Sequence, residues 1–117
     1  MVQETGIQNG IHFDGVHIAP LNPWPSIYYA TTGLNSLGQM INPGQQISRR
    51  DALRLYTREN GWHLNMEDKI GTIEPGKLAD LVVLDRDMFT CTDEELKRIR
   101  PVLTLVGGKI VHSANVF

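Results

Sequence analysis

A hairpin motif near the C-terminus narrows the possible folds more than any other part of the sequence. Two segments rich in β-branched residues, 102–106 and 109–112, are separated only by Gly107 and Gly108. A two-residue loop joins antiparallel strands when both corner residues adopt a positive φ, which glycine does without steric cost. Upstream, Leu81–Leu84 is a continuous apolar run of the kind expected for a strand covered on both faces. The C-terminal part of the chain is therefore predicted to form strands.

Capping motifs predict short helices elsewhere in the chain. Asn22 followed by Pro23 matches an N-cap and a first-turn proline, and Gly33 supplies the corresponding C-terminal stop. Thr92–Glu95 has the spacing of a capping box and is predicted to open one or two helical turns. Near the N-terminus, residues 10–13 are predicted to form a short strand.

A further helix is predicted after a second capping-box spacing, from Ser48 to Asp51. Its apolar stripe is expected to face a core, and its arginines are expected on the more exposed sides. The stripe comprises Ala52, Leu55, Tyr56 and residues 62–64, and the arginines are Arg49, Arg54 and Arg58. Asn60 and Gly61 are both poor helix formers, so the helix is expected to break or bend there.

Length and composition exclude several classes of protein. The chain has 117 residues, which is too short for a complete eight-fold strand-helix barrel of about 250 residues. A composition of 41% hydrophobic and 21% charged residues is typical of a globular protein. The formal net charge is −2, which provides no basic field for a nucleic-acid backbone.

Other sequence features bear on where in the cell the protein is expected. No run of about 18 apolar residues occurs, and the first ten residues lack a signal-peptide pattern, so a membrane span and a signal peptide are not expected. The single cysteine, Cys91, cannot form an internal disulfide, which fits a reducing compartment. We therefore expect a cytoplasmic protein in which Cys91 has no chemical role.

The most distinctive motif spans residues 71–85 and reads Gly-Thr-Ile-Glu-Pro-Gly-Lys-Leu-Ala-Asp-Leu-Val-Val-Leu-Asp. It resembles the C-terminal signature of the metal-dependent amidohydrolases. Within that superfamily, Asp14, residues 19–23 and residues 52–57 are similar to the amidohydrolase-3 type, which includes YtcJ-like and exoenzyme-regulatory-like proteins. The resemblance extends over nearly the whole chain.

The resemblance implies a mixed α/β fold that is incomplete on its own. Residues 1–67 would provide the last strand, a Pro-rich loop and helices of a (β/α)8 catalytic barrel. Residues 68–117 would provide the C-terminal part of a small flanking β-sandwich. The chain is thus expected to be a C-terminal segment of a longer enzyme. Strand edges without their partners invite another chain, so we expect a homo-oligomer that forms through exposed strand edges.

The resemblance also implies a reaction. The parent enzyme would hydrolyse a non-peptide carbon–nitrogen bond of a small amide-like substrate, using a divalent metal such as zinc to activate water. Asp14 matches the metal-associated aspartate of the family and would accept a proton from that water. Strand alternation places His12 on the same face as Asp14, and a loop could return His17 to them, so both histidines are possible pocket residues.

The chain alone is expected to be inactive and to hold no metal tightly. A zinc site generally needs three or four protein ligands held in tetrahedral geometry, and Asp14 with at most two flexible histidines is not expected to form a closed or well-ordered site. A free-standing, non-catalytic module for binding or assembly is the alternative interpretation. Both interpretations predict the same fold, so the motifs alone do not separate them.

Structural roles are predicted for the other conspicuous side chains. Lys77 and Asp80 are expected to satisfy backbone groups or to pair at the surface, rather than to act as acid and base. Two aromatic side chains after the Pro-rich loop are expected in the core rather than against a substrate, namely Tyr28 and Tyr29. No role is predicted for two histidines that lack a partner at ligand spacing, His63 and His112.

Overall fold

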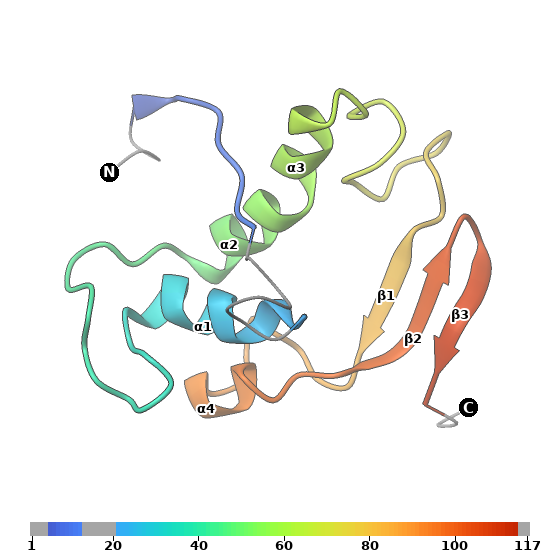
Figure 1. The fold of residues 1–117 in the computed structure, drawn as a ribbon. Helices are drawn as coiled ribbons and strands as arrows, with labels where there is room; N and C mark the ends of the chain where they lie inside the picture. The colour runs from blue at the N-terminus through green and yellow to red at the C-terminus, as the bar shows by residue number, and fades with distance from the viewer. Residues whose placement is uncertain (1–4, 13–20, 115–117) are drawn as a thin grey trace.

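The computed structural model describes residues 5–12 and 21–114, which form short helices and a three-stranded antiparallel sheet (Figure 1). The helices are α1 (Pro23–Thr32), α2 (Arg49–Tyr56), α3 (Arg58–His63) and α4 (Asp93–Leu96). The strands are β1 (Leu81–Leu84), β2 (Pro101–Val106) and β3 (Lys109–Ser113). The helices gather on one side and the sheet stands on the other (Figure 1). Within these residues, no helix has the length and apolar character needed to cross a membrane. Because the described chain contains both helices and a sheet, the fold is mixed α/β, as predicted.

Helix α1 begins and ends where its caps predict. The side chain of Asn22 accepts a hydrogen bond from the backbone N–H of Trp24 at 3.1 Å. At the other end, Gly33 has a φ of 74°, and its N–H donates to the Tyr29 carbonyl. A left-handed residue at this position satisfies a carbonyl that the helix would otherwise leave unpaired.

The predicted N-cap residues of α2 and α4, Ser48 and Thr92, are also confirmed. The Ser48 hydroxyl accepts from the Asp51 N–H and donates to the Asp51 carboxylate, so Asp51 does not reach back to the Ser48 backbone. Thr92 and Glu95 form a complete capping box, with a hydrogen bond in each direction. Each N-cap therefore fixes the first turn of its helix.

The expected helix break at Asn60 and Gly61 is wrong. The break lies at Thr57, which has φ −116° and ψ −82°, and α3 runs through Gly61. The Thr57 hydroxyl donates to the Leu53 carbonyl at 2.7 Å, and Gly71 packs closely on the backbone of Thr57. Side-chain bonding to a carbonyl four residues back favours bending at a threonine. Packing of the loop that contains Gly71 thus helps to decide where the helix bends.

The apolar stripe consequently ends earlier than expected. Ala52 and Leu55 are buried, whereas Trp62 is 43% exposed and Leu64 is also exposed. The break at Thr57 changes the rotational phase between α2 and α3, so residues 62–64 no longer continue the buried side of α2.

The core lies between α1, α2 and the segment that contains α4. Its buried members are Trp24, Ile27, Tyr28, Ala52, Met88, Leu96 and Ile99. Tyr28 is buried as predicted, and the Lys97 ammonium lies 4.7 Å from the centre of its ring. Tyr29 is 40% exposed, contrary to prediction, because the next position on the helix faces away from the core. The core draws on residues from both halves of the chain.

The sheet has the order β1-β2-β3, and both pairs are antiparallel. Gly107 and Gly108 have φ values of 55° and 79°, so the predicted two-residue glycine turn is confirmed. The expectation that β1 is covered on both faces is wrong for the described chain, since Val82 and Val83 are both exposed. Strand β1 reaches the helical core through Leu84, and no described helix lies across the rest of the sheet.

The predicted strand at residues 10–13 is absent over residues 10–12, and residue 13 lies outside the described part of the chain. Ile11 directs its N–H to the Leu55 carbonyl, and its own carbonyl accepts from the Asn60 side chain. Helix groups therefore take the hydrogen bonds that a neighbouring strand would have taken.

Candidate functional site

The structure describes only one of the three residues predicted to line a site. His12 is exposed at the end of the first described segment. Asp14 and His17 lie outside the described residues. The structure does describe residues 5–12, which lead to Asp14, and it shows what holds this segment in place.

This support comes from α2 and α3. The Gln8 side-chain amide donates to Glu59 Oε2 at 3.0 Å, and Asn60 Nδ2 donates to the Ile11 carbonyl at 2.9 Å. Gly10 permits the close approach, because a Cβ at that position would collide with the Asn60 amide. Residues 8–11 are thus fixed to the helical part of the molecule immediately before the sequence reaches Asp14.

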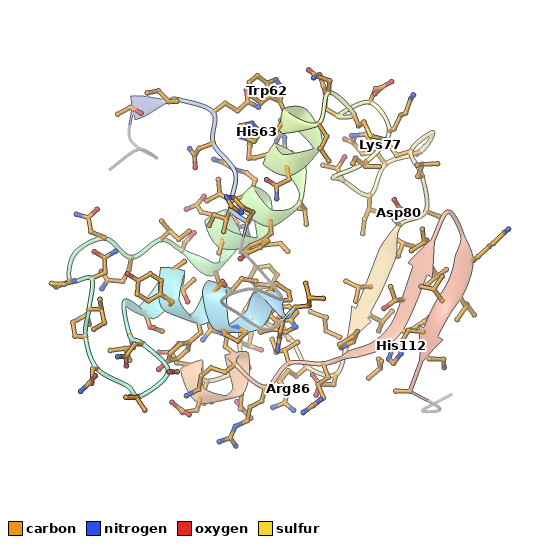
Figure 2. The ribbon with its side chains drawn as sticks, viewed as in Figure 1. Trp62, His63, Lys77, Asp80, Arg86 and His112 are labelled. Atoms are coloured by element: carbon orange, nitrogen blue, oxygen red, sulfur yellow. The ribbon has the colours of Figure 1, made fainter. Side chains whose placement is uncertain are left out.

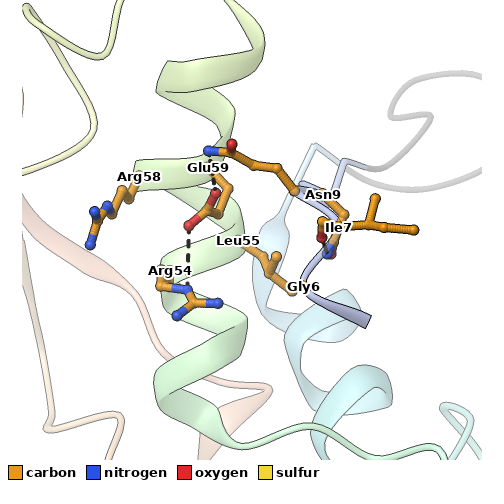
Figure 3. Close-up of a pocket in the computed structure, with 8 residues that line it drawn as sticks. Gly6, Ile7, Asn9, Arg54, Leu55, Arg58 and Glu59 are labelled. Atoms are coloured by element: carbon orange, nitrogen blue, oxygen red, sulfur yellow. Dashed lines mark hydrogen bonds and ion pairs between the residues drawn. The ribbon is translucent and has the colours of Figure 1, made fainter. Parts of the chain in front are cut away.

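A pocket of about 260 Å³ lies between the N-terminal segment and the two helices (Figure 3). It is lined by Gly6, Ile7, Gln8, Asn9, Arg54, Leu55, Arg58 and Glu59. Glu59 is 9% exposed and is the buried charged residue among those that the structure describes. One of its oxygens accepts from Gln8, and the other lies 3.4 Å from Arg54 Nε (Figure 3). Because both carboxylate oxygens already have partners, Glu59 links segments of the chain rather than serving as a free acid or base.

Sequence reasoning missed the link between Gln8 and Glu59. The two residues are 51 positions apart, and neither belongs to a recognisable motif. No local spacing could have revealed a contact of this kind.

Potential metal ligands are not gathered within residues 5–12 and 21–114, where no group of three or more His, Cys, Asp or Glu side chains is placed to hold a metal ion. His63 instead makes an edge contact with Trp62, with ring centres 5.1 Å apart (Figure 2). His112 Nε2 lies 3.2 Å from the Pro101 carbonyl oxygen. These histidines have local structural contacts.

Lys77 belongs to a network that closes the loop before β1. Its ammonium donates to the Glu67 carbonyl and to Thr72 Oγ1, each at 2.6 Å, and pairs with Glu74 at 3.0 Å. Hydrogen bonds from Thr72 and then from Lys77 lower the pKa of Glu74. The Lys77 side chain is saturated by these partners, which confirms a structural role.

Asp80 belongs to a different network from Lys77, and Figure 2 shows the two side chains on separate parts of the loop. Asp80 Oδ1 accepts from the backbone N–H of Gly107 at 2.7 Å. The Asp80 carboxylate is thus hydrogen-bonded to a backbone N–H and not to the Lys77 ammonium. The structure therefore confirms that the two residues do not form an acid–base pair.

Arg49 departs from its predicted place on an exposed side of α2. Its guanidinium donates to the carbonyls of Met88 and Cys91 and to Asp93 Oδ1, each at 2.7 Å. The planar fork of arginine can bind several acceptors at once. Arg49 therefore fastens the start of α2 to the segment that enters α4. Cys91 is half-buried in this contact.

Comparison with known proteins assigns the chain to a class of hydrolases. A family model with the description "Amidohydrolase family" matches residues 2–112. Because the match covers most of the sequence, the chain belongs to the amidohydrolase family. The resemblance inferred from residues 71–85 is thereby confirmed.

Two curated relatives are each 35% identical to the chain over 71 residues. N-substituted formamide deformylase from Arthrobacter pascens matches 61% of this chain, which covers 13% of that protein. The 5-methylthioadenosine/S-adenosylhomocysteine deaminase from Symbiobacterium thermophilum matches 53% of this chain, which covers 16% of that protein. The crystal structure of an amidohydrolase from Thermotoga maritima MSB8 matches 57% of this chain and 16% of its own, with 31% identity and a TM-score of 0.49. The chain therefore spans only a small part of each relative.

Proposed function

We propose that this chain is the C-terminal segment of an amidohydrolase that cleaves a non-peptide carbon–nitrogen bond of a small amide-like substrate. The family match over residues 2–112 carries the proposal. The segment status rests on the 13% and 16% of the curated relatives that the chain covers. In this proposal residues 1–67 complete a catalytic barrel, and residues 68–117 contribute to a flanking β-sandwich.

The names of the curated relatives favour an enzyme over a non-catalytic module. One is named for removing a formyl group from N-substituted formamides, and the other for deaminating adenosine derivatives. Both names describe cleavage of a carbon–nitrogen bond in a small molecule. N-substituted formamides and related amides are accordingly the first substrate class to test.

Asp14 is the proposed catalytic residue. Its carboxylate would accept a proton from the attacking water and return it to the leaving nitrogen. The anchoring of residues 8–11 on α2 and α3 supports this role, because a catalytic group must be held in a defined position. His12 and His17 are proposed to line the same pocket.

A divalent metal fits the proposed class of reaction, and zinc is the first ion to test. The described residues do not form a site for it, since no group of three ligand side chains gathers among them. Its ligands would therefore include Asp14 and side chains beyond the described residues.

The test replaces Asp14 in an intact hydrolase. The host is either the longer protein that contains this segment or the A. pascens deformylase with this chain in place of its matching part. Asp14→Asn is expected to lower kcat/KM by about 10²–10⁴-fold, the usual contribution of general acid–base catalysis. Hydrolysis is measured on an N-substituted formamide and on 5-methylthioadenosine.

Asp68→Asn is the matched control, because Asp68 is an exposed carboxylate outside the proposed site. It is expected to leave kcat/KM within about twofold, as for most exposed substitutions. Unchanged turnover in the Asp14→Asn enzyme would contradict the proposal.

A further inference from the structure

We draw no further inference here: the strongest candidate, the pocket of about 260 Å³ between residues 6–9 and helices α2 and α3, belongs to the site already described, since both oxygens of its buried carboxylate, Glu59, have partners in Gln8 and Arg54, and nothing among the described residues shows what occupies the rest of it.

Discussion

Asp80 accepts a hydrogen bond from the backbone N–H of Gly107 at 2.7 Å, and so holds the β2–β3 turn from outside the hairpin. The adjacent Ala79 carbonyl accepts from the Gly108 N–H at 3.0 Å. The residues just before β1 thereby bind both corner glycines. The signature of residues 71–85 therefore contains a contact that fixes the position of the hairpin.

Asp80→Ala is expected to destabilise the chain by about 1 kcal/mol, the usual net value of one hydrogen bond. Asp80→Asn keeps a side-chain oxygen that can accept from Gly107, so its effect is expected to be smaller. Urea unfolding measures the difference, with Asp68→Ala as the exposed control. Equal losses for Asp80→Ala and Asp68→Ala would show that the contact contributes nothing.

Arg49→Met is expected to lower the free energy of unfolding by about 2 kcal/mol, because two carbonyls and a carboxylate lose a charged donor. Arg49→Lys is expected to have an intermediate effect, since one ammonium cannot reach all three acceptors in the same geometry. Arg50→Met is the matched control, because Arg50 is the exposed neighbour on the same helix. Thermal and urea unfolding provide the measurement. Similar losses for the Arg49→Met and Arg50→Met chains would refute the role assigned to Arg49.

Stability is expected to decline at acid pH. Hydrogen bonds from the Thr92 N–H and hydroxyl lower the pKa of Glu95, and a hydrogen bond from Arg86 is the main cause of the lowered pKa of Asp85. A carboxyl whose pKa is lower in the folded than in the unfolded chain stabilises the fold above its unfolded pKa. That contribution is lost as the pH falls through the folded pKa. The free energy of unfolding should therefore decrease below about pH 4, the ordinary range of carboxyl groups.

Glu95→Gln tests the cause of this acid dependence. It removes the titrating group and should make the decrease of stability with falling pH less steep. Thr92→Ala should have a smaller effect on that slope, because the backbone N–H, which is the larger cause of the lowered pKa of Glu95, is retained. An unchanged slope in the Glu95→Gln chain would contradict the assignment.

The 117-residue chain alone is expected to lack hydrolase activity and to lose added zinc on dialysis. The reason is that its described residues gather no group of three metal-ligand side chains. Elemental analysis after dialysis measures the metal, and an assay with an N-substituted formamide measures turnover. Stoichiometric zinc in the dialysed chain would overturn this expectation.

The predictions that succeeded depend on local sequence. Asn22, Ser48 and Thr92 cap helices through contacts two or three residues away, and the Gly107-Gly108 turn needs only its own two corners. Side-chain oxygens and glycine have strong local preferences, so short motifs are sufficient to place these features.

The features that sequence reasoning missed depend on distant contacts. Thr57 rather than Asn60 ends α2, and Gly71 from a later loop packs at that bend. Arg49 was expected on an exposed side of its helix, but it donates hydrogen bonds to residues about 40 positions away in the sequence. Local spacing carries no information about such pairs. The assignment of Asp14 rested on resemblance to a family, and it stays a prediction.

The order in which residues enter the core has a consequence for biosynthesis. Trp24 and Tyr28 of α1 are covered in part by Leu96 and Ile99, which a ribosome adds much later. Domains generally fold as units during synthesis, and apolar surface exposed in unfinished chains favours aggregation. A nascent chain that stops before Leu96 would present both aromatic rings to the surrounding solution. Premature termination in this region should therefore yield products that chaperones retain and proteases remove.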